Sequence, residues 1–251
     1  MRNWWVELLD LVLPRSCAGC GRLDVEICDS CRARLWLPAR RVDPPVAPGG
    51  RERAGGARPV GVWAGPDYAG AVARVILAWK DRGRPWLGRE LSPVLAGAVR
   101  AGLDEAEDLG LVSRGSDVVA LVGVPSSRRA IRRRGQDLVT ALARGAAADL
   151  ARHGWTVRTE PALRRRRHIR DQAGLAARAR ARNVAGAFAV RRRATWLVGQ
   201  PVVLVDDVVT TGASLAEAAR ALREAGAQLV AICAVCATPA RHGLSVRRRV
   251  D

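Results

Sequence analysis

The pattern of apolar and polar positions along the chain predicts a domain of alternating strands and helices. Apolar runs rich in valine, leucine, isoleucine and alanine occur at residues 117–124, 201–205 and 228–235. Continuous runs of this kind are typical of strands that are covered on both faces. Helical periodicity occurs at residues 70–80, 89–101, 135–152 and 214–224. We therefore expect an α/β fold built on a parallel sheet.

Changes in composition divide the chain into three parts. Residues 1–37 combine an apolar stretch, which predicts a short helix, with four closely spaced cysteines. Residues 38–59 are rich in proline, glycine and arginine and show little apolar periodicity, which favours a linker or an irregular loop. Residues 60–251 hold the alternating runs and form the predicted α/β domain. We expect the cysteine-rich part and the α/β domain to have separate cores.

The charge of the chain favours a polyanionic partner. The 251 residues carry a formal net charge of +18, and Lys80 is the only lysine among the 42 basic residues. A compositional bias toward arginine explains the choice of residue, but it does not explain the net excess of positive charge. Nucleic acid or a phosphorylated ligand fits such an excess, and a solvated basic surface is the alternative.

Nothing in the sequence predicts insertion into a membrane. Residues 1–13 are largely apolar, but Glu7 and Asp10 interrupt them, and the stretch is shorter than the ~20 residues that a span needs. A short helix packed on the body of the protein is the better interpretation. The protein is expected to be cytoplasmic, which agrees with cysteines arranged for a metal rather than for disulfides.

Four cysteines near the N-terminus have the spacing of a zinc site. They form two CxxC pairs and are Cys17, Cys20, Cys28 and Cys31. Two turns of this type direct four thiolates at one point, which suits tetrahedral Zn²⁺. Four protein ligands leave no position for water or substrate, so such a site is structural. Four unrelated buried thiols are the alternative.

A third CxxC pair, Cys233 and Cys236, has a different interpretation. Both cysteines lie in or beside the last predicted strand, and residues three apart on a strand point to opposite faces. We therefore expect buried core thiols here, not metal ligands.

The segment that follows the run at 201–205 has the strongest chemical signal. Asp206 and Asp207 are expected at the carboxyl-terminal edge of the sheet, where open α/β sheets bind ligands. A short loop then opens a helix with Thr210, Thr211, Gly212, Ala213 and Ser214. Backbone N–H groups at a helix N-terminus favour phosphate, and paired carboxylates suit vicinal hydroxyls with a bound cation. A ribose 5-phosphate fits both halves, while an acidic turn before an ordinary helix cap is the alternative.

This segment resembles the motif of type I phosphoribosyltransferases that binds 5-phosphoribosyl-1-pyrophosphate (PRPP). The resemblance implies that PRPP binds together with Mg²⁺, and that Asp206 and Asp207 hold the 2′- and 3′-hydroxyls of its ribose. It assigns the 5′-phosphate to the loop of Thr210, Thr211, Gly212, Ala213 and Ser214.

Further motifs narrow the resemblance to the ComF family, which is linked to DNA uptake in competent bacteria. They lie at residues 124–135, 170–175 and 182–188, and the four N-terminal cysteines complete the set. One departure concerns the turn after the first strong strand. The family commonly reads Arg-Gly-Phe-Asn-Gln there, whereas this chain has Gln136 and Asp137 after Arg134 and Gly135.

The resemblance also implies a binding place for pyrophosphate. The turn after the first strong strand would bind it through Ser126, Ser127 and Arg128. The arginine-rich residues 164–182 would form a mobile loop that closes over the pyrophosphate. Arginine donors and Mg²⁺ would then stabilise the departing charge. A solvated surface loop is the alternative for these arginines.

Two functions are compatible with these features. The first is transfer of a phosphoribosyl group to an unidentified acceptor, with release of pyrophosphate. The second is a non-catalytic or PRPP-regulated module that binds single-stranded DNA and acts with the DNA-uptake machinery in natural transformation. Residues 61–110, including Tyr68, Trp79, Lys80 and Trp86, are candidates for an acceptor hood, although such residues more often belong to a core. A glutamine-dependent amidotransferase is disfavoured because the chain starts Met-Arg-Asn without a terminal cysteine.

Overall fold

The computed structural model of the protein describes residues 16–46, 48, 60–166 and 184–239. The predicted N-terminal helix at 1–13, the motif at 170–175 and most of the arginine-rich residues 164–182 lie outside this range.

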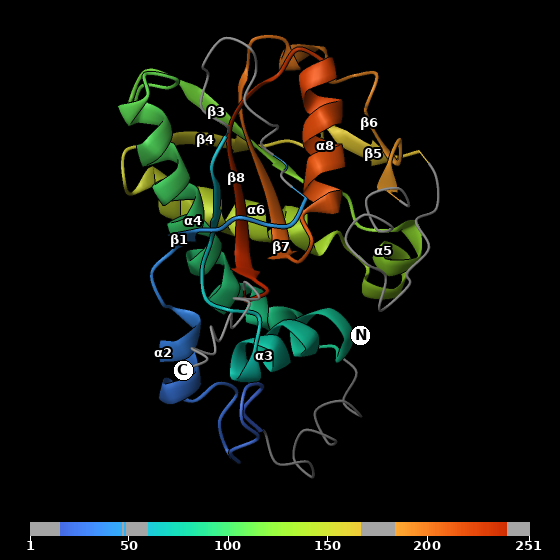
Figure 1. The fold of residues 1–251 in the computed structure, drawn as a ribbon. Helices are drawn as coiled ribbons and strands as arrows, with labels where there is room; N and C mark the ends of the chain where they lie inside the picture. The colour runs from blue at the N-terminus through green and yellow to red at the C-terminus, as the bar shows by residue number, and fades with distance from the viewer. Residues whose placement is uncertain (1–15, 47, 49–59, 167–183, 240–251) are drawn as a thin grey trace, which may run out of the picture.

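A six-stranded sheet with the order β1-β2-β8-β7-β3-β4 forms the centre of the described protein (Figure 1). Its strands are β1 (Arg40–Arg41), β2 (Val62–Ala64), β3 (Val118–Gly123), β4 (Thr156–Thr159), β7 (Pro201–Val209) and β8 (Gln228–Ala237). Neighbouring strands run parallel except β1, which pairs antiparallel with β2. A separate antiparallel pair consists of β5 (Leu163–Arg165) and β6 (Phe188–Val190). The predicted fold class, α/β with a mainly parallel sheet, is confirmed.

Helices cover both faces of the sheet. The described helices are α2 (Asp29–Leu35), α3 (Gly70–Asp81), α4 (Gly88–Asp108), α5 (Arg128–Arg134), α6 (Leu138–Ala151) and α8 (Ala213–Glu224), with short 3₁₀ turns at Pro85–Leu87 (η1) and Thr195–Leu197 (η2). Figure 1 shows α8 on one face, and α4 and α6 on the other. Alternate residues of β3 separate the two cores: Val119 and Leu121 pack with α4 and α6, whereas Ala120 and Val122 pack with α8. Burial on both faces explains why the predicted strands are continuous apolar runs.

Helix α3 lies below the sheet in Figure 1, beside the carboxyl-terminal end of β8 and next to α2. Trp79 in its last turn is only 3% exposed, which fixes that turn in the core. Helix α3 therefore connects the cysteine-rich part of the chain with the edge of the sheet where ligands are expected.

The predicted boundaries differ from the structure in two informative places. Strand β7 runs on to Val209, because Val208 and Val209 continue the apolar run behind the two acids. Asp206 and Asp207 consequently lie within the strand and not after it. The helix predicted from residue 135 begins at Leu138 as α6, with Asp137 as its cap accepting from the N–H of Val139. Gly135 instead ends α5, a short helix that the sequence did not predict, with a positive φ of 75°.

The stretch predicted as a linker or irregular loop has ordered contacts in its described part. Strand β1 lies on the edge of the sheet, and the N–H of Val42 donates to the carbonyl of Val62 at 2.8 Å. The N–H of Val46 donates to the carbonyl of Thr211, also at 2.8 Å. Residues 40–46 thus contact the α/β domain, while the division of the chain at 37 and 59 stays a prediction.

Candidate functional site

Two adjacent carboxylates lie near the carboxyl-terminal end of β7. Asp206 pairs in register with Ala234 of the neighbouring strand β8. On the other side of β7, the last residue of β3, Gly123, pairs with Val205, which precedes Asp206. The N–H of Asp207 donates to Asp206 Oδ1 at 2.8 Å. Burial and the neighbouring charge of Asp207 raise the pKa of Asp206 to about 8. The pair is thus a partly buried acidic centre held by backbone geometry.

A lysine from a distant part of the chain faces this pair. Lys80, in the last turn of α3, places its Nζ 2.7 Å from Asp207 Oδ2, and the two side chains are only 24% and 14% exposed. Burial alone would lower the pKa of Lys80, but the carboxylates of Asp207 and Asp206 raise it overall. The amine is therefore protonated at neutral pH. Sequence reasoning named Lys80 only among candidates for an acceptor hood, because no local spacing links residue 80 to residue 207.

The predicted phosphate loop leads from β7 into α8. Gly212 has a positive φ of 79° and is the N-cap residue of α8, which begins at Ala213 and is 12 residues long. Thr210 is exposed, and Thr211 and Ser214 are partly exposed. A helix N-terminus with hydroxyl side chains around it is a favourable place for an anion.

Gly212 is packed tightly against a segment from the N-terminal part of the chain. In the structure, a Cβ at Gly212 would clash with the carbonyl oxygen of Val46 and would lie 2.9 Å from the Cβ of Pro44. The glycine is thus required by its positive φ and by the segment that packs on it.

The predicted pyrophosphate turn follows β3 and opens α5. Ser127 is the N-cap of α5, and its Oγ accepts from the N–H of Ala130 at 3.1 Å. Ser126 donates twice to the carboxylate of Asp137, from its N–H at 3.2 Å and from its Oγ at 3.1 Å. Arg128 is exposed. The position at which the chain departs from the ComF pattern therefore has a structural role, because Asp137 holds the turn and caps α6.

The end of α3 also contacts this second turn. Asp81, the last residue of α3, accepts from Arg133 at 2.6 Å and from Arg134 at 3.0 Å, both in α5. Two consecutive residues of one helix thus contact the two segments from which the site is predicted: Lys80 contacts β7, and Asp81 contacts α5.

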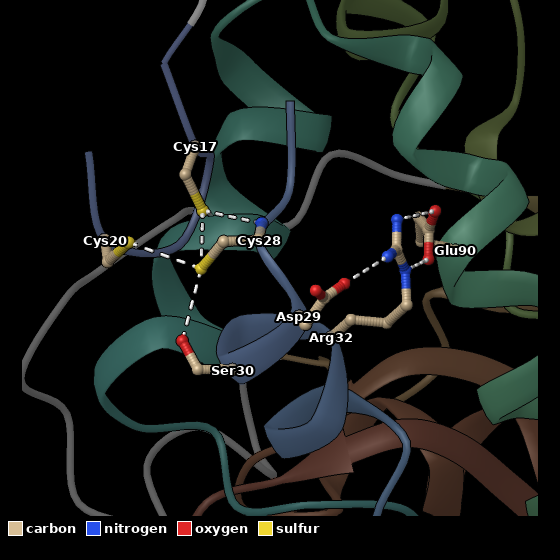
Figure 2. Close-up of polar contacts among 7 residues, drawn as sticks. All are labelled: Cys17, Cys20, Cys28, Asp29, Ser30, Arg32 and Glu90. Carbon is tan, nitrogen blue, oxygen red and sulfur yellow. Dashed lines mark hydrogen bonds and ion pairs between the residues drawn. The ribbon is translucent and has the colours of Figure 1, made fainter. Parts of the chain in front are cut away.

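The four N-terminal cysteines are brought together as the spacing predicts. Their Sγ atoms all lie within 4.8 Å of one another, and Figure 2 shows three of the sulfur atoms converging. Cys28 Sγ lies 3.7 Å from Cys17 Sγ and 3.6 Å from Cys20 Sγ. Thiolates about 2.3 Å from one Zn²⁺ in a tetrahedron are about 3.8 Å apart. The donor set and its spacing therefore fit zinc.

The cysteine cluster does not have a core of its own, contrary to our expectation. Cys17, Cys28 and Cys31 are buried in the same apolar cluster as α3 and α4. Figure 2 shows Arg32 of α2 reaching Glu90 of α4, with Nε and Nη2 donating to the two carboxylate oxygens at 3.0 and 3.1 Å. The short chain around the metal-like site is too small to bury its own apolar side chains, so it packs on the larger domain.

The third cysteine pair is buried in the core, as predicted. Cys233 Sγ donates to the carbonyl of Ala98 at 3.4 Å, and Cys236 Sγ donates to the carbonyl of Asp207 at 3.7 Å. Neither thiol belongs to a metal-like cluster among the described residues.

A pocket of about 410 Å³ lies between the segment from α3 to α4 and helix α6. Trp79, Trp86 and Gln136 contribute to its wall, but none of the predicted PRPP-binding residues does. No helix in the described part of the chain is long and apolar enough to cross a membrane.

Comparison with known proteins finds a family that matches the region of the candidate site. The family described as the phosphoribosyl transferase domain matches residues 130–248. That range includes β7, the loop that follows it and α8. This part of the chain is therefore similar to phosphoribosyl transferase domains, and the cluster of four cysteines lies on its N-terminal side.

Two curated relatives match shorter stretches. The chain is 42% identical over 77 residues to the DNA utilization protein YhgH of Escherichia coli O157:H7, covering 31% of this chain and 33% of that protein. It is 47% identical over 58 residues to the orotate phosphoribosyltransferase of Nocardioides sp. (strain ATCC BAA-499 / JS614), covering 20% of this chain and 32% of that protein. The matches thus span about a third of the length of each relative.

Two solved structures were also found to be similar. One is the glutamine PRPP amidotransferase from B. subtilis complexed with ADP and GMP, with a TM-score of 0.33 and 21% identity over 59% of this chain and 26% of that one. The other is an adenine phosphoribosyltransferase, with a TM-score of 0.37 and 15% identity over 82% and 89% of the two chains.

Proposed function

We propose that this protein binds PRPP with Mg²⁺ and transfers the phosphoribosyl group to an acceptor that is still to be identified, releasing pyrophosphate. The observation that carries the proposal is the arrangement of Asp206 and Asp207 within β7, directly before a loop that turns at Gly212 into the N-terminus of α8. This arrangement lies within the part of the chain that matches the phosphoribosyl transferase domain.

In this proposal the two ends of the ligand meet chemically different partners. The carboxylates of Asp206 and Asp207 accept hydrogen bonds from the ribose hydroxyls. The 5′-phosphate lies over the loop and the first turn of α8 and is bound by Thr210, Thr211, Gly212, Ala213 and Ser214. Charge-assisted hydrogen bonds at both ends fix the ribose between them.

The diphosphate is assigned to the turn of Ser126, Ser127 and Arg128. Ser126 Oγ already donates to Asp137, whereas Ser127 Oγ accepts from Ala130 and keeps its own hydrogen. The Ser127 hydroxyl and the guanidinium of the exposed Arg128 are therefore the side-chain donors in this assignment. Mg²⁺ carried by PRPP would neutralise part of the charge on the departing pyrophosphate. The role of the protein is to hold the ribose and to present positive charge where negative charge develops.

We further propose that Cys17, Cys20, Cys28 and Cys31 bind a structural Zn²⁺. Support comes from the spacing of their sulfur atoms and from their number, because four thiolates complete a tetrahedral site. The ion would stabilise the contact of the cysteine-rich part with α3 and α4, away from the reacting groups.

A PRPP-regulated module that binds single-stranded DNA is the second candidate. Arginines exposed on α5 favour it, namely Arg128, Arg129, Arg132 and Arg133, together with the net charge of +18. A partial relative is named a DNA utilization protein. Two assays separate the candidates: incubation with Mg²⁺ and PRPP, with and without cell extract, and binding of an oligonucleotide at several salt concentrations. Pyrophosphate release with a new phosphoribosyl product supports the transferase. Salt-dependent oligonucleotide binding without pyrophosphate release supports the DNA-binding module.

A further inference from the structure

A cation from another part of the fold contacts the acidic pair of the candidate site. Lys80 Nζ lies 2.7 Å from Asp207 Oδ2. Asp206 is the preceding residue, and its Oδ1 accepts from the N–H of Asp207. One ammonium thus faces two carboxylates whose charges repel each other.

The identity of this cation is unusual for the chain. Lys80 is the only lysine among 42 basic residues. Arginine is used in other partly buried ion pairs, such as Arg32 with Glu90 and Arg220 with Glu217. Lysine and arginine bind a carboxylate with different geometry, so the residue type at this position affects how Asp207 is held.

The two side chains differ in how they occupy a carboxylate. A guanidinium is a planar fork that binds both oxygens, as Arg32 binds Glu90 and as Arg220 binds Glu217. An ammonium is a compact point charge, and Lys80 Nζ lies 2.7 Å from Oδ2 of Asp207. A lysine can therefore neutralise Asp207 through one contact and leave lone pairs of the carboxylate to accept a hydroxyl.

We propose that Lys80 is a positioning residue of the PRPP site: it holds Asp207 by one oxygen, offsets the repulsion between Asp206 and Asp207, and keeps both able to accept the ribose hydroxyls. This inference rests on the proposed function, because it concerns how that site binds its ligand.

The residues before and after Lys80 in helix α3 are both held in place by other parts of the fold. Trp79 before it is buried at 3% exposure, and Asp81 after it is bound to Arg133 and Arg134 of α5. The ammonium is therefore presented from a rigid turn, and its side chain does not have to be ordered when the ligand binds.

The positive charges around the pair lower the pKa of Asp206, as the proposal requires. Among the described residues, Lys80 from α3 and Arg165 from β5 lower the pKa of Asp206, whereas burial and Asp207 raise it. The thiol of Cys236 on β8 is also close to the pair, and its pKa is raised by burial and by Asp207. Removing Lys80 removes a charge that favours ionised carboxylates.

The test is calorimetric titration with Mg²⁺ and PRPP between pH 7 and 9, on wild type, Lys80→Met and Lys80→Arg. Lys80→Met should lose about tenfold or more in affinity, and its binding should recover only at a higher pH than in wild type. Lys80→Arg should bind more weakly than wild type at every pH, because the fork occupies both oxygens of Asp207. Arg114→Met, which removes an ion-paired arginine just before β3 at the opposite edge of the sheet, should bind like wild type.

Wild-type affinity in Lys80→Met at every pH would overturn the proposal, and wild-type affinity in Lys80→Arg would overturn its claim that lysine is required. Thermal unfolding of each variant checks the fold. A ligand-free arm separates this inference from the proposed function. A ¹³C NMR titration of the aspartate carboxyls should show a higher apparent pKa for the pair in Lys80→Met, and an unchanged pKa overturns the inference even if wild type does not bind PRPP.

Discussion

The N–H of Asp207 donates a 2.8 Å hydrogen bond to Oδ1 of Asp206, so the first carboxyl of the pair is oriented by the backbone of the second. One oxygen of Asp206 is thereby engaged within the strand, and one oxygen of Asp207 is engaged by Lys80. Each carboxylate has more lone pairs than these contacts use, so both acids can still accept from a ligand. A ligand with two neighbouring hydroxyls, such as a ribose, matches this arrangement.

The raised pKa of Asp206 predicts a pH-dependent stability. Its folded value of about 8 lies above the unfolded value of about 3.9, so its contribution is present below pH 4 and is lost as pH rises through about 8. The free energy of unfolding of wild type should therefore fall over this range by more than that of Asp206→Asn. Urea unfolding at a series of pH values measures both slopes, and parallel curves would contradict the prediction.

The sequence predicted the central elements of the fold because burial leaves a simple pattern. The strands β3, β7 and β8 are covered on both faces and read as apolar runs. The three-residue strand β2 and the four-residue strand β4 lie toward the edges and are too short to show a pattern. Helix α5 was not predicted, because its seven residues are mostly arginines and none is buried, so no apolar periodicity marks it. Helix α6 begins at Leu138 and not at Gly135, because a left-handed glycine beside a helical pattern is hard to distinguish from a tolerated helix glycine.

The candidate site was only partly predictable from the sequence, because only those of its parts that are close together in the chain form a recognisable pattern. The motif from Asp206 to Ser214 is local, so its strand, loop and helix could be recognised together. The contact of Lys80 with Asp207 joins residues that are far apart in the sequence, and it depends on how α3 crosses the edge of the sheet. The separate core expected for the cysteines was wrong because α2, α3 and α4 share one cluster.

The cysteine cluster should bind one Zn²⁺ per chain. Elemental analysis of protein purified without chelator measures it, and metal-free protein with four freely titratable thiols would contradict the assignment. Because Cys28 is buried in the cluster shared with α3 and α4, Cys28→Ser should lower the thermal midpoint of the whole described domain and not only loosen the N-terminal part. Asp29→Ala, at an exposed neighbouring position, is the control and should leave the metal content unchanged.

The phosphate loop should be tested at Thr210 and not at Gly212. Any side chain at Gly212 meets Val46 and a positive φ, and should cost about 1–3 kcal/mol of stability with or without ligand. Thr210 is exposed, so Thr210→Val should keep the thermal midpoint while PRPP affinity falls several-fold. Thr156→Val at the start of β4 is the matched control, and equal PRPP affinity in both variants would remove Thr210 from the site.

Helix α5 should contribute to binding of single-stranded DNA if the second candidate function is present. Replacing Arg128, Arg129 and Arg132 together by glutamine should weaken oligonucleotide binding and reduce its dependence on salt, because fewer counterions are released. Fluorescence anisotropy at several salt concentrations measures this, with Arg34→Gln on α2 as the control for loss of an exposed arginine. Binding that is undetectable at low salt in wild type would eliminate this function.

Binding of Mg²⁺ and PRPP to wild type and to Asp207→Asn, followed by calorimetry, tests the central claim most directly. The substitution keeps the shape of the side chain but removes the charge that Lys80 contacts and that a ribose hydroxyl would use. Wild type should bind, and Asp207→Asn should bind about tenfold more weakly or worse, since a charge-assisted hydrogen bond contributes about 1.5–3 kcal/mol. Asp104→Asn, a surface acid paired with Arg114, should match wild type. Absence of heat and of thermal stabilisation in wild type at millimolar PRPP, or equal affinity in Asp207→Asn, would contradict the account.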